Sequence, residues 1–124
     1  MGIFVRATLA LALTSLSTAS ALAQDAVKAG SKHYTVLVDN PQVRVLRIRY
    51  APHETSVRHS HPNSVIVYLT DAHNKFVLGN GKTIERSGKA GEAAWSPGGV
   101  HTPTNVADKP MEAILVELKE HAKK

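Results

Sequence analysis

The sequence contains no cysteine, and this absence limits both its chemistry and the ways in which it can be stabilised. Disulfide bonds, thiolate metal sites and cysteine nucleophiles are all excluded. Any metal site must therefore use histidine, aspartate or glutamate. With 124 residues, the chain has room for one domain whose core can be stable without covalent cross-links.

A dense basic run is also missing, although the formal net charge is +5. The arginines at positions 44–49 and the lysines at positions 119–124 are scattered, and no aromatic residues alternate with them. Nucleic-acid sites gather basic and aromatic side chains on one surface. We therefore expect a solvated basic surface and no nucleic-acid partner.

Residues 1–23 have the pattern of a secretory signal peptide. Arg6 places a positive charge before an apolar stretch over residues 7–13, and Ala21-Leu22-Ala23 is a small-x-small cleavage pattern. A membrane anchor needs about 20 strongly apolar residues, and the Ser/Thr-rich tract at residues 14–20 interrupts this stretch. We expect cleavage after Ala23, export to the periplasm or the medium, and no stable membrane anchor in the product.

The remaining chain divides into a linker, one domain and a tail. Small and polar residues at 24–32 predict a linker, and residues 121–124 form a charged tail. Residues 33–120 show short apolar runs broken by turn residues, which is typical of an all-β domain. Strands are expected at 34–38, 43–50, 56–61, 64–70, 74–78, 82–86, 93–96, 101–106 and 111–118. Inside 43–50 the apolar residues change strand face, which predicts a bulge there, and residues 79–81 predict a hairpin turn.

His59 and His61 are separated by one residue, so on a strand they point to the same side. His101 follows Pro97-Gly98-Gly99 about forty residues later and would complete one face of a metal site. Neutral imidazole is a common ligand of transition metals. We therefore expect His59, His61 and His101 to bind one divalent metal, with Fe, Mn, Ni, Cu and Zn all open. Three protein ligands leave positions for water or substrate, as in catalytic sites.

These motifs resemble those of the cupin superfamily. His59-Ser60-His61 resembles the core of the first cupin motif, and the stretch from Gly91 through Pro97-Gly98-Gly99 and His101 to Asn105 resembles the second. The resemblance covers about residues 34–119 and implies a double-stranded β-helix, or jelly-roll barrel. His53 stands where a turn glycine is usual in the family.

The resemblance also implies a metal site that lacks one ligand. Cupins normally use three histidines and one glutamate, and the positions of that glutamate hold Val65 and Ile66. The resemblance then implies a three-histidine site like that of thiol dioxygenase relatives, or a site that has lost tight metal binding. Glu54 is the acid nearest to the histidines in sequence and is a candidate replacement.

Two functions follow as expectations. The first is an exported metal-dependent enzyme with a dioxygenase-like reaction on a small organic molecule, and the alternative is a non-catalytic module that binds a small ligand or a metal. A third, weaker reading is an isomerase or sugar-binding cupin without a metal. No residue is an evident general base, so no catalytic side chain and no organic cofactor site is assigned. A homodimer is expected by analogy with such folds.

Other residues receive mainly structural interpretations. Asn105 shares a strand face with His101, and structural and pocket-lining roles are equally open. The aromatic residues Tyr50, Tyr68 and Trp95 are expected in the core. Arg47 and Arg49 are expected on a solvated strand face. Surface positions are expected for His33, His53, His73 and His121.

Overall fold

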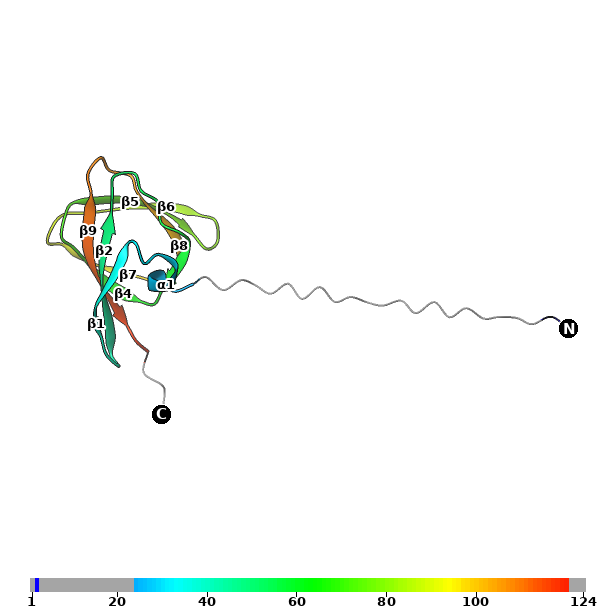
Figure 1. The fold of residues 1–124 in the computed structure, drawn as a ribbon. Helices are drawn as coiled ribbons and strands as arrows, with labels where there is room; N and C mark the ends of the chain where they lie inside the picture. The colour runs from blue at the N-terminus through cyan, green and yellow to red at the C-terminus, as the bar shows by residue number, and fades with distance from the viewer. Residues whose placement is uncertain (1, 3–23, 121–124) are drawn as a thin grey trace.

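Two antiparallel β-sheets packed face to face form the protein in a computed structural model, which describes Gly2 and residues 24–120 (Figure 1). The elements, in chain order, are α1 (Ala26–Ala29), β1 (Tyr34–Asp39), β2 (Val43–Tyr50), β3 (His59–His61), β4 (Ser64–Tyr68), β5 (Ala72–Leu78), β6 (Thr83–Gly88), β7 (Ala93–Ser96), β8 (Gly99–Asn105) and β9 (Met111–Leu118). The five-stranded sheet has the order β1-β2-β9-β4-β7, and the four-stranded sheet has the order β3-β8-β5-β6. The predicted all-β jelly-roll barrel is confirmed.

Helical structure is minimal in this part of the chain. Among residues 24–120, the four-residue α1 is the only helix, and it is far too short to cross a membrane. The signal peptide expected at residues 1–23 and the tail at 121–124 lie outside the described residues.

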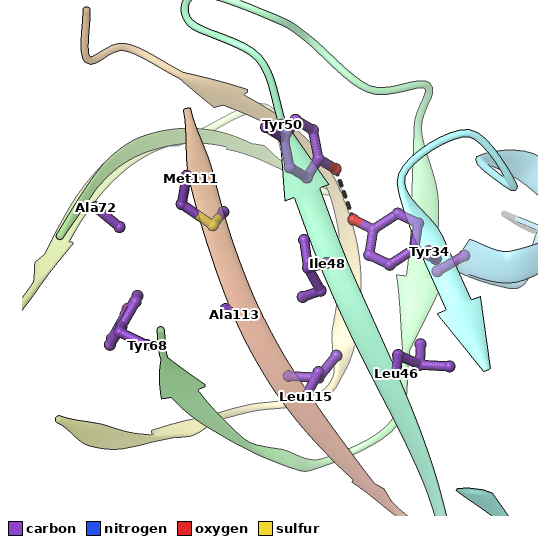
Figure 2. Packing of buried hydrophobic residues seen from close by; sticks show 10 residues of the cluster. Tyr34, Leu46, Ile48, Tyr50, Tyr68, Ala72, Met111, Ala113 and Leu115 are labelled. Carbon is purple, nitrogen blue, oxygen red and sulfur yellow. Dashed lines mark hydrogen bonds between the residues drawn. The ribbon is translucent and has the colours of Figure 1, made fainter. Parts of the chain in front are cut away.

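The core comes from alternate residues of the two central strands, β2 and β9. Side chains of a strand point alternately to its two faces, so every second residue can be buried against the opposite sheet. Figure 2 shows this row of inward side chains, which is formed by Leu46, Ile48 and Tyr50 of β2 and by Met111, Ala113 and Leu115 of β9. The same alternation places Glu117 of β9 on the inner face, where it is 1% exposed.

The bulge predicted within residues 43–50 lies instead in the neighbouring strand. The β1–β2 register shifts between Val36 and Val38, while β2 pairs with β9 without interruption from Val43 to Tyr50. An extra residue disrupts every ladder in which its strand takes part. It is therefore accommodated in β1, an edge strand with one neighbour, rather than in β2, which has two.

The segment for which composition predicts a linker, residues 24–32, packs onto the barrel. The Asp25 carboxylate accepts a hydrogen bond from Val27 N (3.1 Å) and caps α1. Ala26 is 0% exposed, and the Ser60 amide donates to the Gln24 carbonyl (2.9 Å). These contacts fix the start of the domain beside β3, the strand that carries two of the candidate metal ligands.

Two turns contain a residue with a left-handed backbone conformation. The expected hairpin joins β5 to β6, with a hydrogen bond from Leu78 N to Lys82 O (2.8 Å) and Gly81 at a φ of 84°. His53, where a turn glycine is usual in cupins, has a φ of 60°. A side chain in this left-handed region is strained by its own Cβ atom.

We expect His53→Gly to be more stable than His53→Ala by about 1 kcal/mol, because only glycine adopts this backbone conformation without strain. Both variants lose the exposed contact of His53 with Asp108, so their difference isolates the backbone term. Urea unfolding of the two variants measures it. Equal midpoints would show that the turn relaxes to another conformation.

Candidate metal centre

Strand pairing brings the three histidines of the motif to one place. His59 and His61 are alternate residues of β3 and share its inner face, while Ser60 lies on the other face. In the antiparallel pairing of β3 with β8, His59 lies directly opposite His101. The three imidazoles therefore form one cluster between the sheets, as the sequence predicts.

The ring nitrogens that face one another have the spacing of ligands to a single ion. His59 Nε2 lies 3.1 Å from His61 Nε2 and 3.0 Å from His101 Nε2. One ligand nitrogen from each ring lies within 4.8 Å of the other two. Metal–nitrogen bonds of roughly 2.1 Å place neighbouring ligand atoms about 3 to 3.4 Å apart. The cluster could therefore hold one metal ion.

Hydrogen bonds at the other ring nitrogen fix two of the imidazoles. His59 Nδ1 donates to the Val57 carbonyl (2.7 Å), and His61 Nδ1 donates to the Glu117 carboxylate (2.7 Å). Because a carbonyl and a carboxylate can only accept here, the protons lie on Nδ1. In neutral rings the two Nε2 atoms then direct lone pairs at each other across 3.1 Å. Such a contact is favourable only when a cation, a proton or a metal ion, lies between them.

Burial keeps His59 and His101 in the neutral form that a metal requires. Burial lowers the pKa of His59 to about 4, with a further contribution from the neighbouring His61. Burial likewise lowers the pKa of His101 to about 3, and His59 and His61 add to the effect. Neither ring has to lose a proton at pH 7 before it can bind a metal.

Glu117 links the site to the start of the domain. One carboxylate oxygen accepts from His61, and the other accepts from Arg44 Nε (2.6 Å). The guanidinium of Arg44 also donates twice to Asp25, at 2.6 and 3.1 Å. Burial alone would raise the pKa of Glu117, but the hydrogen bonds from His61 and Arg44 outweigh it, so the pKa lies below its usual value. An ionised carboxylate of this kind orients a metal-binding histidine and makes its ring a stronger donor.

A small cavity of about 50 Å³ adjoins the histidines between the sheets. His61, His101, Tyr34 and Tyr50 form one part of its wall. The rest of the wall is mainly apolar and is formed by Ile48, Ile66, Phe76, Pro103, Met111 and Leu115. Asn74, Ser96 and Asn105 add three polar side chains. A second hollow of about 190 Å³ shares His61 and His101 and is lined by Arg86. The histidine cluster therefore lies between a mainly apolar cavity and a more polar hollow.

Comparison with known proteins gives matches among solved structures only. No protein-family model matches the sequence, and no curated protein does so either. A cupin domain from Bordetella pertussis is 25% identical, covers 70% of this chain and 92% of its own, and has a TM-score of 0.64. A conserved protein with a double-stranded β-helix domain from Klebsiella pneumoniae is 22% identical over 73% of this chain and 78% of its own, with a TM-score of 0.56. A Cupin 2 conserved barrel domain protein from Salinispora arenicola is 20% identical over 69% and 74%, with a TM-score of 0.51.

The chain has the double-stranded β-helix fold of the cupins and is similar to small cupin domain proteins.

The glutamate that cupins usually contribute has no carboxylate replacement in the cluster. Ile66, at one of its two expected positions, lines the apolar cavity instead. Glu54 accepts from Lys32 (2.8 Å) and from the Ala51 amide (3.1 Å), and it does not belong to the metal-binding group. The candidate replacement named from the sequence is therefore wrong. Glu117 is the carboxylate bonded to a histidine of the cluster, and it acts from the far side of the ring.

Tyr34 and Glu117 contact the site, and the sequence interpretation missed both. The sequence pattern could have indicated Glu117, because it continues the inward row of Met111, Ala113 and Leu115 and is an acid on an otherwise apolar face. No such pattern indicates Tyr34, because the next alternate residues of its strand, Val36 and Val38, are exposed. Its hydroxyl oxygen lies 3.0 Å from His59 Nε2.

Asn105 and two of the three aromatic residues expected in the core are buried in the structure. Asn105 takes both roles: it lines the cavity, and its amide donates to the Ala51 and Lys109 carbonyls (3.1 and 2.8 Å). Tyr50 and Tyr68 are buried as expected. The core position expected for Trp95 is wrong, because its strand β7 is a sheet edge and its side chain is 53% exposed.

The basic and histidine side chains outside the cluster are mostly peripheral. Arg47 and Arg49 both pair with Glu112 and do not line the cavity. His53 and His73 are exposed as expected, and His121 lies outside the described residues. The surface position expected for His33 is wrong: it is 7% exposed and stacks on Tyr50 with ring centroids 4.3 Å apart.

The lowered pKa values of His59 and His101 predict that the metal-free protein loses stability on acidification. Between pH 6.5 and pH 4 the unfolded state binds protons at His59 and His101 that the folded state does not, so stability falls with the pH. From pH 7 to pH 5 we expect a loss of up to about 2 kcal/mol from each residue. Urea unfolding in a chelator measures it. An unchanged slope in a His59→Gln, His101→Gln double variant would contradict this origin.

We expect Glu117→Gln to weaken metal binding about 10- to 100-fold, because the neutral amide orients His61 less strongly and withdraws the negative charge. Competition with a chromophoric chelator measures the affinity, and circular dichroism checks the fold. Glu112→Gln is the matched control, since Glu112 lies on the same strand but pairs with Arg47 and Arg49. Equal affinities in the two variants would remove Glu117 from the site.

Proposed function

We propose that this cupin binds one divalent transition metal through His59, His61 and His101 and catalyses a dioxygenase-like reaction on a small organic molecule. The convergence of three imidazole nitrogens supports this best. His59 and His61 are held with Nδ1 bonded to an acceptor and Nε2 turned to the common centre. A bound metal would supply open coordination positions and redox or Lewis-acid chemistry there.

The residues around the centre support a reaction that excludes bulk water. His59 is 0% exposed and His61 is 9% exposed, and an apolar cavity adjoins them. Electrostatic interactions are stronger in such a site than in water. The hydroxyls of Tyr34 and Tyr50 line this cavity and offer hydrogen bonds to a bound molecule.

The cavity favours a substrate with an apolar, uncharged body. No lysine, arginine, aspartate or glutamate is among its lining residues. Arg86 lines the second hollow beside His61 and His101, where a polar or anionic end could remain. A sugar would require polar partners for many hydroxyl groups, so this lining argues against the sugar-binding alternative.

A non-catalytic binding module is the second candidate, and one observation favours it. The metal-binding group contains three neutral imidazoles and, within residues 24–120, no carboxylate. Such a set lacks the negative charge that helps to retain a redox metal. In this reading the centre captures a metal or a small ligand without turnover.

We also propose that the protein acts after export, in the periplasm or the medium. The signal-peptide pattern of residues 1–23 supports this. Gln24, the first residue after the expected cleavage point, already pairs with Ser60 of the barrel. Cleavage there would leave the described domain intact. The expected homodimer stays a prediction.

We expect about one metal ion per chain in protein purified without an affinity tag, and loss of that metal in His59→Ala and in His101→Ala. Each substitution removes one of three ligands, which costs most of the affinity of an open site. Elemental mass spectrometry measures the content. His73→Ala, which alters an exposed histidine of β5, is the control and should retain the metal.

Oxygen-uptake and calorimetric measurements on the metal-loaded protein separate the candidate functions. Oxygen uptake that depends on the metal and on a small apolar substrate supports the dioxygenase-like reaction. Ligand or metal binding by calorimetry without turnover supports the binding module. A wild-type protein that is metal-free and cannot be reloaded overturns both metal-dependent forms.

A further inference from the structure

Tyr34 lies where an additional ligand of the histidine centre would lie. Its hydroxyl oxygen is 3.0 Å from His59 Nε2, the same spacing as between His59 and His101. Its ring meets the rings of His59 and His61 edge-on, with centroids 5.1 and 5.4 Å apart. The side chain reaches the cluster from β1, in the sheet opposite to the one that carries the histidines.

The hydrogen bonds of Tyr34 cannot remain as they are when a metal binds. Its hydroxyl proton has two available acceptors, His59 Nε2 at 3.0 Å and Tyr50 Oη at 2.6 Å. Figure 2 shows the bond to Tyr50. A metal uses the lone pair of His59 Nε2, so this acceptor is lost. The oxygen of Tyr34 then lies beside the ion, and Tyr50 can donate its own proton to it.

Charge balance favours coordination by this oxygen. Three neutral imidazoles give a divalent ion no anionic ligand, although Glu117 lies behind His61, and buried charges are normally paired directly. In the described part of the chain no carboxylate belongs to the cluster, and Ile66 lines the cavity where a cupin glutamate is expected. Tyr34 is 4% exposed, and burial raises its pKa well above the usual value, so its oxygen would become an anion only on a bound metal, as tyrosine does on haem iron.

We propose that Tyr34 is the fourth protein ligand of the centre, bound as a phenolate that accepts a hydrogen bond from Tyr50. The inference rests on the metal site of the proposed function. Coordination breaks the O–H bond of Tyr34, forms a metal–oxygen bond, and releases one proton to solvent. A metal held by Tyr34 and the three histidines would leave coordination positions for dioxygen or substrate.

The test loads metal-free protein with Fe(II) under anaerobic conditions, oxidises it with ferricyanide, and records the visible spectrum. A phenolate bound to Fe(III) gives an intense charge-transfer band in the visible range, and imidazole ligands alone do not. We expect the band in the wild type. Tyr34→Phe should lose it while retaining about one iron per chain through the three histidines.

Matched variants make the assignment specific. The chain has 3 tyrosines, so Tyr50→Phe and Tyr68→Phe complete the set. Tyr68→Phe should leave the band unchanged, because Tyr68 does not line the cavity. Tyr50→Phe should keep the band at a shifted wavelength, since the phenolate loses its hydrogen-bond donor. A band that persists in Tyr34→Phe overturns the proposal.

Two further measurements do not depend on how well Tyr34→Phe folds. Resonance Raman on the wild type, excited in the band, should show phenolate ring modes. Zinc binding, followed by calorimetry in buffers of different ionisation enthalpy, should release one proton per ion. Iron bound without a visible band, or zinc bound without proton release, overturns the role of Tyr34 and leaves the three-histidine site intact. Failure to bind either metal overturns the proposed function as well.

Discussion

The centre of this protein depends on three imidazole nitrogens that lie within 4.8 Å of one another, with an ionised carboxylate behind one ring and none among the ligand atoms of the described residues. His59 and His61 each use Nδ1 as a donor, so their Nε2 lone pairs face each other at 3.1 Å. Two lone pairs at this distance repel unless a cation lies between them. The folded barrel therefore holds the site in a state that a metal ion would relieve, and the stability of the metal-free protein depends on the same contacts.

This arrangement is maintained from outside the cluster by a chain of charges. Glu117 fixes His61, Arg44 fixes Glu117, and Asp25 fixes Arg44 while it caps α1. This row of ion pairs begins at Asp25, one residue after Gln24, the expected first residue of the exported form. A buried ion network of this kind contributes little net stability, but removal of one member leaves an uncompensated charge. The start of the domain and the orientation of His61 are thus coupled.

The local parts of this structure could be predicted from the sequence. The strands at 43–50, 93–96 and 111–118 have the predicted bounds because alternation and turn residues are properties of neighbouring positions. The histidine cluster followed from one spaced pair and a third residue in a matching motif. Tyr34 reaches the site across the barrel, which no local pattern records. Trp95 was misplaced for a similar reason, since an edge strand differs from a central one only in its neighbours.

The lost glutamate changes the electrostatics of the site more than its shape. With Ile66 in the wall and neutral Tyr34, a bound divalent metal would have no anionic ligand among the described residues. With Tyr34 as a phenolate, one unit of the metal's charge is cancelled. At about 4 Å and an effective dielectric constant of about 20, one unit charge changes the interaction with an anion by about 4 kcal/mol. The proposed coordination by Tyr34 would therefore change how strongly the centre attracts an anion, without a change in the volume of the cavity.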